Sequence, residues 1–379
     1  MTQVSKEIRN QIIRYVIYII FVLGLTALAF YLTVGNNVTT IFETLQKANV
    51  WYIIAILAIV LGCILFRSIA IFVLTRLFEK KYFFHRAIAI DQVGALYRMV
   101  TPAGLGGHFM ETYTYKKQGV KISDALSVIA MYSIVYQLVL IIYGLITIIC
   151  KHQLVNEIGY VSISFSNAGT ASVPLWVLIA IGFTFNVLAI GLIYLVSYSN
   201  GFYKFVKGPF GNLLRKVRIV KDKEQYNEKL DAAITNFRSN LKLLLKNVPV
   251  LLITAVALFA YITISYSVPY FCGLSLGNTS PYANFWDSVL LSNFHQMVTC
   301  IIPIPGNSLL SELFFLRLFY PSSGPNFFDT EEIARASLLL WRSLMFIFPL
   351  IIACLFTVIY RPRKRKNIDE NQEDQNPQE

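Results

Sequence analysis

The chain has 379 residues, of which 56% are hydrophobic and 14% are charged, and its formal net charge is +12 at pH 7. Because soluble domains carry about 25% charged residues, this composition excludes a soluble enzyme and indicates a polytopic membrane protein. The basic residues stand next to apolar runs, so we expect them to contact anionic lipid headgroups on the cytoplasmic face and not nucleic acid.

Six apolar segments are long enough to cross a hydrocarbon layer about 30 Å thick. They cover residues 13–33, 50–75, 124–150, 173–198, 248–274 and 334–360. The first follows basic residues and contains the triplet Ala27-Leu28-Ala29, which resembles a signal-peptide cleavage site. Since the triplet lies inside the apolar run and not after it, we expect an uncleaved first helix.

Two further apolar segments, near 87–115 and 284–320, are broken by proline and glycine. The first break contains Pro102, Gly104, Gly106 and Gly107 before Glu111, and the second contains Pro303, Pro305, Gly306 and Asn307 before Glu312. In each, a proline precedes the glutamate by nine positions. Such breaks free backbone groups that hydrocarbon cannot satisfy, so they occur only beside protein or water. The pair predicts a membrane-embedded site.

The positions of Lys and Arg in the loops predict the orientation. Basic residues flank both ends of 87–115, so we expect this segment to enter from the cytoplasm and return. The uncharged stretch 275–283 and the acidic stretch 321–333 flank 284–320, which we expect to re-enter from outside. Both termini are then cytoplasmic, as is the basic loop 199–246, in which we predict an amphipathic helix around residues 223–246. The polar tail 361–379 is predicted to be disordered.

The predicted fold is an all-α polytopic membrane protein with about six spanning helices and two re-entrant broken-helix hairpins. Residues 1–150 and 151–360 form two transmembrane repeats of inverted topology. Val50 precedes Pro102 by 52 positions and Val248 precedes Pro303 by 55, which favours the repeat. Inverted halves with broken helices are typical of secondary transporters. The alternative is a chance self-similarity of apolar sequence.

Seven charged residues stand in the apolar regions: Arg67, Asp91, Arg98, Glu111, Asp287, Glu312 and Arg342. Each costs about 2.5–3.5 kcal/mol at the bilayer centre, so we expect ion pairs or a polar cavity. The helix N-termini after the two breaks suit a phosphate group, to which arginines add bidentate donors. The glutamates suit a cationic headgroup or a coupling proton.

The candidate headgroup contacts are therefore Glu111, Glu312, Arg67, Arg98, Arg342 and Gln137, with the glycines and prolines of the breaks forming the half-helix ends. Alternative roles stay open for several of them. Arg67 and Arg342 can pair with Glu111 or Glu312 in a purely structural role, and Gln137 can hydrogen-bond a neighbouring helix. His108 and His295 are typical of polar residues in helix packing.

Enzyme and metal motifs are absent from the sequence. It contains no HExxH, no Walker loop and no dinucleotide fingerprint, and the G-x-S-x-G match at 273–277 ends an apolar helix instead of following a strand. The five cysteines lie in or beside apolar runs without metal-ligand spacing. We expect no metal, no cofactor, and a transporter in preference to an enzyme.

The motifs resemble the transmembrane (flippase) region of the bacterial lysylphosphatidylglycerol synthase family, particularly stand-alone members from Gram-positive bacteria. The family pattern P-x-P-G-G-x-G-x-x-E appears at 303–312 with Asn307 and Leu309 in place of two glycines, and L-x-W-R appears as Leu339, Leu340, Trp341 and Arg342. The break at 101–107 also fits. Full-length members add a soluble aminoacyl-transferase domain, which we do not expect in this chain.

The resemblance implies a multi-pass translocase of the bacterial cell membrane. Its partner would be a membrane phospholipid such as aminoacylated phosphatidylglycerol, or a glycolipid; self-association stays open. Two alternatives remain. One is a membrane enzyme, or a subunit of one, in lysylphosphatidylglycerol synthesis, and the other is a transporter of a small soluble anion.

Overall fold

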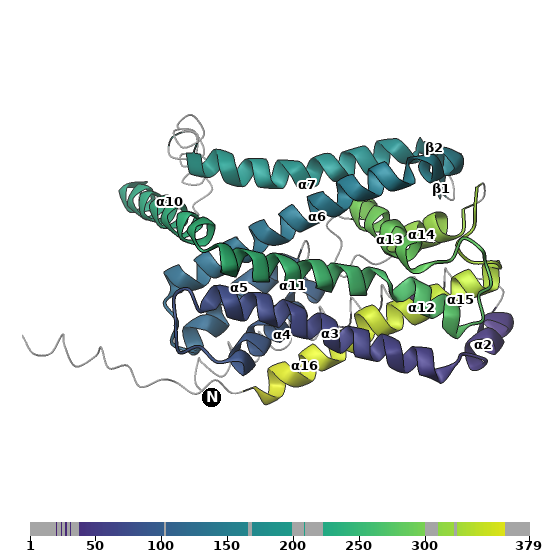
Figure 1. Ribbon diagram of the computed structural model, residues 1–379, viewed down its shortest axis with the longest axis horizontal. Helices are drawn as coiled ribbons and strands as arrows, with labels where there is room; N and C mark the ends of the chain where they lie inside the picture. The colour runs from purple at the N-terminus through teal and green to yellow at the C-terminus, as the bar shows by residue number, and fades with distance from the viewer. Residues whose placement is uncertain are drawn as a thin grey trace, which may run out of the picture.

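The computed structural model describes residues 38–101, 104–165, 169–198, 223–299, 310–321 and 324–360, together with residues 20, 24, 27, 28, 31 and 208. These residues form a bundle of long helices with one small β-hairpin (Figure 1). Within them, four helical stretches are long and apolar enough to cross a membrane: Val50–Thr75, Ile122–Ile158, Val248–Ser275 and Glu331–Ile359. The predicted all-α polytopic class is confirmed.

The helices follow the predicted spans closely. They are α3 (Val50–Thr75), α6 (Ile122–Ile158), α7 (Leu175–Tyr198), α11 (Val248–Tyr266) with α12 (Val268–Ser275), and α15 (Glu331–Arg342) with α16 (Phe348–Ile359). A π-helical turn, Ser343–Ile347, joins α15 to α16. The predicted first span, 13–33, lies almost wholly outside the described residues. The predicted amphipathic helix corresponds to α10 (Lys223–Lys246).

Each broken segment forms a pair of helices. The first gives α4 (Phe84–Val100) and α5 (Leu105–Lys117), and the second gives α13 (Phe285–Thr299) and α14 (Leu310–Phe319). Pro102 and the second break, with Pro303, Pro305, Gly306 and Asn307, lie outside the described residues.

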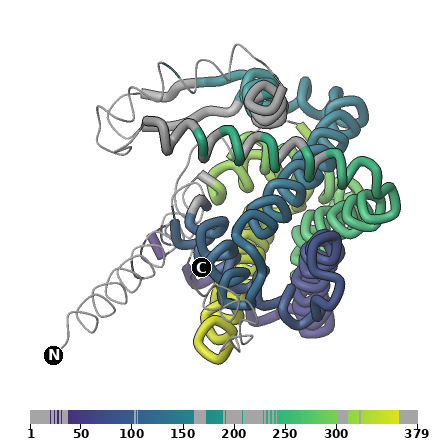
Figure 2. Tube along the Cα trace, turned by 90° about the vertical axis from the view of Figure 1, so that its left-hand side faces the viewer, coloured from purple at the N-terminus to yellow at the C-terminus, as the bar shows by residue number. Residues whose placement is uncertain are grey.

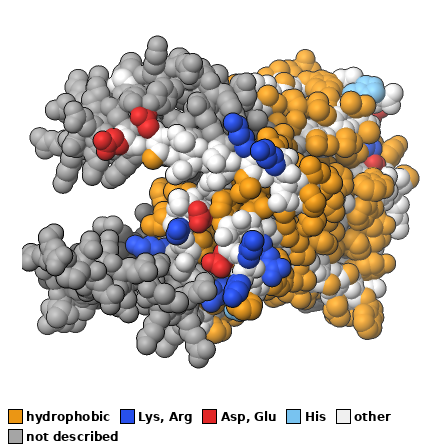
Figure 3. All heavy atoms as spheres, turned by 60° about the vertical axis from the view of Figure 1, so that its left-hand side comes forward, with side chains coloured by type: hydrophobic (Ala, Val, Ile, Leu, Met, Phe, Trp, Pro, Cys, Tyr) orange, Lys and Arg blue, Asp and Glu red, His pale blue; other side chains and the backbone are white. Residues whose placement is uncertain are grey.

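Both ends of the α4–α5 hairpin lie at one end of the bundle, which we call the basic end. After α5, Gln118 donates to the carbonyl of Arg86 in the first turn of α4 (3.1 Å) and accepts from the Tyr82 hydroxyl (2.6 Å). The basic residues of this end are Arg76, Lys80, Lys81, Arg86, Lys116, Lys117 and Lys121. In Figure 3, charged side chains gather toward one side, whereas much of the remaining visible surface is hydrophobic.

Both ends of the α13–α14 pair lie at the opposite end of the bundle. The loop before α13 is tied to the loop after α14, because the Thr279 backbone N–H and hydroxyl both donate to Asp329 Oδ2 (2.9 and 2.7 Å). The Asn278 amide also donates to the carbonyl of Phe327 (3.0 Å). The two helix pairs thus enter the bundle from opposite ends.

Three features were not predicted from the sequence. The short helix α2 (Val38–Gln46) precedes α3, and α6 continues to Ile158 past a non-helical residue, Lys151. After α6, strands β1 (Tyr160–Phe165) and β2 (Gly169–Pro174) pair antiparallel, with Tyr160 opposite Pro174.

The core depends on close helix contacts around α6, which crosses the middle of the bundle (Figure 2). A Cβ atom on Gly182 of α7 would lie 2.0 Å from the Met297 carbonyl oxygen of α13, and one on Gly144 of α6 would lie 2.4 Å from Met297 Cε. Small residues permit such approaches, which drive helix association where lipid removes the hydrophobic effect between helices. The two glycines therefore position α13, and with it the second helix pair.

Candidate functional site

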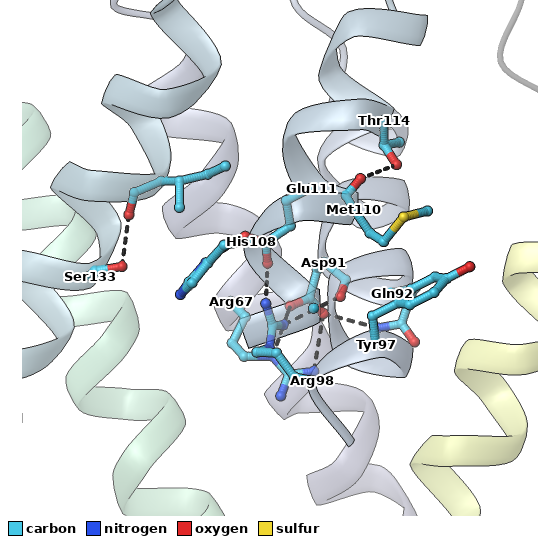
Figure 4. Close-up of polar contacts among 12 residues, drawn as sticks. Arg67, Asp91, Gln92, Tyr97, Arg98, His108, Met110, Glu111, Thr114 and Ser133 are labelled. Carbon is cyan, nitrogen blue, oxygen red and sulfur yellow. Dashed lines mark hydrogen bonds and ion pairs between the residues drawn. The ribbon is translucent and has the colours of Figure 1, made fainter. Parts of the chain in front are cut away.

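Four charged side chains from three helices meet inside the bundle (Figure 4). We call Arg67 of α3, Asp91 and Arg98 of α4, and Glu111 of α5 the Asp91 cluster. Asp91 is fully buried at its centre. Arg67 Nε lies 3.0 Å from Asp91 Oδ1, and Arg67 Nη2 donates to Oδ2 at 3.0 Å, a two-point contact. Gln92 Nε2 also donates to Asp91 Oδ2 (2.9 Å).

Glu111 links the cluster to its exposed side. Arg98 Nη1 donates to Glu111 Oε1, and His108 Nδ1 lies within hydrogen-bond distance of Oε2 (3.1 Å). The side chain of Glu111 is 6% exposed, that of Arg98 is 31% exposed and that of His108 is 48% exposed. The cluster is therefore fully buried at Asp91 and partly exposed at Arg98 and at the neighbouring His108.

Two glycines make room for this cluster. A Cβ atom on Gly94 would lie 2.3 Å from Glu111 Oε1, and one on Gly107 would lie 2.2 Å from Arg98 Cγ and 3.0 Å from the Gly94 carbonyl oxygen. Any larger residue would displace the carboxylate, the guanidinium or the α4–α5 contact. Gly107, which the sequence placed among the candidates, therefore acts by leaving space for Arg98.

Thr101 satisfies the backbone at the break between α4 and α5. Its hydroxyl donates to the Tyr97 carbonyl (2.6 Å) and accepts from the Gly106 backbone N–H (3.0 Å). A Cβ on Gly106 would lie 2.5 Å from Thr101 Cγ2, so only glycine permits this contact. Gly104 has φ of 67°, which glycine adopts without strain. These residues set the angle at which α5 brings Glu111 back to α4.

The second charged site is the ion pair between Glu312 and Arg342. Arg342 Nε of α15 lies 2.8 Å from Glu312 Oε1 of α14, and the two side chains are 5% and 3% exposed. The Arg342 guanidinium also lies over the Phe346 ring, 4.2 Å from its centroid. His295 of α13 is buried beside the pair, with Nε2 2.8 Å from the Ser311 carbonyl oxygen. Unlike the Asp91 cluster, the Glu312–Arg342 pair is closed to its surroundings.

Gln137 makes its contacts with a neighbouring helix. Its amide donates to both the side-chain oxygen and the carbonyl of Asn186 on α7 (2.5 and 3.1 Å). Nearby on α6, Tyr136 lies between Tyr132 and Tyr261 of α11, and the Tyr261 ring receives the Arg67 guanidinium at 5.2 Å. A row of aromatic rings therefore extends from the Asp91 cluster across α6.

The central role of Asp91 was not predicted from the sequence. Asp91 was counted among the membrane charges but not among the headgroup contacts, and the alternative pairing given for Arg67 was with Glu111 or Glu312, whereas the structure pairs Arg67 with Asp91. The spacing contained a usable indication, because Asp91 and Arg98 stand seven positions apart and thus lie on one helix face.

The Asp91 cluster suits binding in preference to covalent chemistry. With His108 neutral, its two arginines and two carboxylates sum to zero charge. Among the described residues, Arg98 Nη2 has only long contacts, at 3.5 Å to the Asp91 carbonyl oxygen and 3.6 Å to Oδ1, which leaves donor capacity for an anion. Among the described residues, no group of three or more His, Cys, Asp or Glu side chains could hold a metal ion.

The family model described as "Lysylphosphatidylglycerol synthase TM region" matches residues 12–353. The match covers most of the chain, including the Asp91 cluster and the Glu312–Arg342 pair. No curated protein and no solved structure matches the chain.

Proposed function

Because the chain belongs to the lysylphosphatidylglycerol synthase transmembrane-region family, we propose that it is a lipid translocase of the bacterial cell membrane. It would move a phospholipid such as aminoacylated phosphatidylglycerol, or a glycolipid, between the two leaflets. Family membership and the apolar helices support a lipid-related role for a multi-pass membrane protein. The movement of lipid between the leaflets is our proposal and goes beyond this lipid-related role.

The observation that carries this proposal is the half-open Asp91 cluster. Arg67 makes a two-point contact with the fully buried Asp91, and its side chain is 16% exposed. The Arg98 side chain is 31% exposed, and within the described part of the chain its Nη2 makes only long contacts. Arginine matches phosphate geometry through paired N–H donors. We therefore assign Arg98 as the first contact of a phosphate-bearing headgroup.

The first turn of α5 supports the same assignment. Gly104 caps this helix without a side-chain hydrogen bond, and a Cβ on Gly104 would lie 3.6 Å from Arg98 Cγ. The Arg98 chain thus runs past a helix N-terminus, where backbone N–H groups and the helix dipole favour anions. The tyrosine row from Tyr132 to Tyr261 would face the rest of a headgroup.

The second site supports transport through its contrast with the first. The Glu312–Arg342 pair is closed while the Asp91 cluster is partly open. In alternating access, one repeat rocks against the other around a fixed site, so that the cavity opens on one side of the membrane while it closes on the other. We propose that Glu312 and Arg342 separate to contact the headgroup in the opposite state, with His295 and Gln137 as helix-packing residues.

The orientation follows from charge. We propose that the basic end faces the cytoplasm, where its Lys and Arg residues contact anionic lipids, and that both termini lie on that side. The α4–α5 and α13–α14 hairpins then re-enter from opposite sides, as inverted repeats.

A role in lysylphosphatidylglycerol synthesis is the second candidate, because the matched family is the transmembrane region of a synthase. Lipid analysis of a deletion strain separates the two. If the protein translocates lipid, loss of the gene changes the amount of aminoacylated lipid that an impermeant amine reagent labels on the outer leaflet, while total lipid composition stays constant. A fall in total aminoacylated lipid would instead support synthesis and contradict our proposal.

Transport of a small soluble anion is the third candidate. It predicts uptake of that anion into protein-containing vesicles whose lipids do not exchange between leaflets. Inorganic phosphate is the appropriate probe, because it shares the phosphate chemistry that Arg98 recognises.

A further inference from the structure

The charge balance of the Asp91 cluster constrains what can bind there. Arg67 and Arg98 contribute two positive charges, and Asp91 and Glu111 contribute two negative charges. A phosphodiester bound at Arg98 would leave this cluster with one unpaired negative charge. Burying an uncompensated charge among apolar helices carries a large free-energy penalty, so a compensating positive charge must enter with the headgroup.

We propose that an anionic lipid headgroup binds the Asp91 cluster together with one proton, which is taken up at the Glu111–His108 pair. This inference rests on the proposed function and adds proton linkage to it. One proton from water adds to the Glu111 carboxylate or to the His108 imidazole for each anionic headgroup bound, and no covalent bond to the lipid changes.

The contacts favour Glu111 over Asp91 as the group that responds. Asp91 is fully buried and is held by Arg67, Gln92 and Arg98. Glu111 has one oxygen on Arg98 and the other on His108, whose side chain is 48% exposed. His108 therefore connects the buried carboxylate to the exposed surface of α5, and we assign the proton to this pair. Protonation of Glu111 would also weaken its hold on Arg98 Nη1 and release that donor for the phosphate.

The other groups facing Glu111 do not change charge near neutral pH. Arg67 of α3 and Arg98 of α4 stay protonated. Tyr115 of α5, near Glu111, and Tyr132 of α6, near Arg98, are phenols, whose ordinary pKa of about 10 lies above the range to be tested. Among the cluster's described carboxylates, Glu111 is the one that contacts a partly exposed titratable side chain, His108.

The same balance distinguishes headgroups by their own charge. A headgroup that carries phosphate alone, as in phosphatidylglycerol, needs the proton. A headgroup that also carries an ammonium group, as in phosphatidylcholine or an aminoacylated lipid, brings its own positive charge. Proton uptake should therefore accompany the first class and not the second.

Isothermal titration calorimetry tests this directly. Short-chain phosphatidylglycerol is titrated into the full chain in an uncharged detergent between pH 6 and 8, in two buffers with different protonation enthalpies. We expect uptake of about one proton, and a Kd that rises about tenfold per pH unit at the alkaline end, because linked equilibria are reciprocal. Short-chain phosphatidylcholine should bind with no proton uptake.

Two variants locate the proton. Glu111→Gln should bind phosphatidylglycerol with a pH-independent Kd and no proton uptake, because the cluster then carries a permanent compensating charge. Glu331→Gln changes an exposed carboxylate that pairs with Arg335 on α15, and it should retain uptake of about one proton. If Glu111→Gln does not fold, the comparison of the two lipids on the unaltered chain still decides the matter.

Three results would overturn the inference. Phosphatidylglycerol binding without proton uptake would reject the linkage and leave the proposed lipid translocation standing. Proton uptake that persists in folded Glu111→Gln would reject the assigned pair. No binding of either lipid would contradict both the linkage and the headgroup site on which the proposed function depends.

Discussion

At the scale of single residues, Asp91 is the buried carboxylate around which the charged side chains of the first hairpin and α3 are arranged. It makes a two-point contact with Arg67, accepts from Gln92 and lies near Arg98. Removing one partner of a buried ion pair leaves the other uncompensated, which is more costly than losing an exposed pair.

Asp91→Asn should therefore lower the free energy of unfolding by about 3–5 kcal/mol. Asp287→Asn is the matched control, because Asp287 pairs with Lys151 while their side chains are 20% and 22% exposed, and it should cost about 1 kcal/mol or less. Equilibrium unfolding of both variants in mixed detergent micelles checks the difference. Equal losses would show that Asp91 does not organise the cluster.

The sequence predicted that the membrane charges form ion pairs, but it did not identify Asp91 as the partner of Arg67. Glu111 and Arg98 were both candidates and do meet, and Arg342 does pair with Glu312. The pairing of Arg67 with Asp91 depends on the depth at which α3 packs against α4, and a linear pattern does not encode this. The space for Glu111 beside Gly94 is likewise a tertiary property.

At the scale of helices, the sequence predicted most boundaries because long apolar runs and Pro/Gly breaks are local features. The predicted span 50–75 coincides with α3, whose start is capped by Asn49 accepting from the Trp51 N–H. The β-hairpin and the extension of α6 past Lys151 were missed. Both lie beyond the apolar run, where periodicity gives little information.

The break between α4 and α5 gives a prediction at this scale. Thr101→Val should cost about 1–3 kcal/mol of unfolding free energy, because it leaves the Gly106 N–H without its acceptor. Thr112→Val on the exposed face of α5 removes a hydroxyl that donates to the His108 carbonyl within the helix, and it should cost less than about 0.5 kcal/mol. Thermal unfolding in detergent compares the two. Equal unfolding temperatures of the two variants would contradict the bridging role of Thr101.

The α7–α13 contact gives another prediction. Gly182→Ala would place Cβ 2.0 Å from the Met297 carbonyl oxygen, and backbone must move to accept it, at a cost of about 1–3 kcal/mol. Gly191→Ala on the same helix meets nothing within 4 Å and should be neutral or stabilising by up to about 1 kcal/mol. Unfolding midpoints of the purified variants test this. A lower unfolding midpoint for Gly191→Ala together with an unaltered midpoint for Gly182→Ala would contradict the close contact between α7 and α13.

At the scale of the whole molecule, the two helix pairs enter from opposite ends of the bundle. The contacts of Gln118 with Arg86 and of Thr279 with Asp329 close the two pairs at their respective ends. The loop charges predict that these two ends face opposite sides of the membrane, and this orientation stays a prediction. They could not predict that the first site is half open and the second closed, since exposure depends on how all the helices pack together.

The membrane sidedness that we propose from the loop charges is tested by cysteine labelling. Single cysteines introduced at Lys117 and at Asn278 should react with an impermeant maleimide from the cytoplasmic side and from the outside, respectively. The parent chain measures the background from Cys150, which is exposed. Labelling of both positions from the same side would end the inverted-repeat hypothesis.

The most direct test of the proposed translocation is a leaflet-exchange assay in proteoliposomes. Fluorescent phosphatidylglycerol and an aminoacylated lipid are reconstituted with the unaltered chain, with Arg98→Gln and with Arg335→Gln, and an impermeant quencher reports the fraction in the outer leaflet. We predict exchange by the unaltered chain and by Arg335→Gln, and at least tenfold slower exchange by folded Arg98→Gln. Exchange that is unaffected by Arg98→Gln, or no faster than in protein-free vesicles, would contradict a lipid translocase built on the Asp91 cluster.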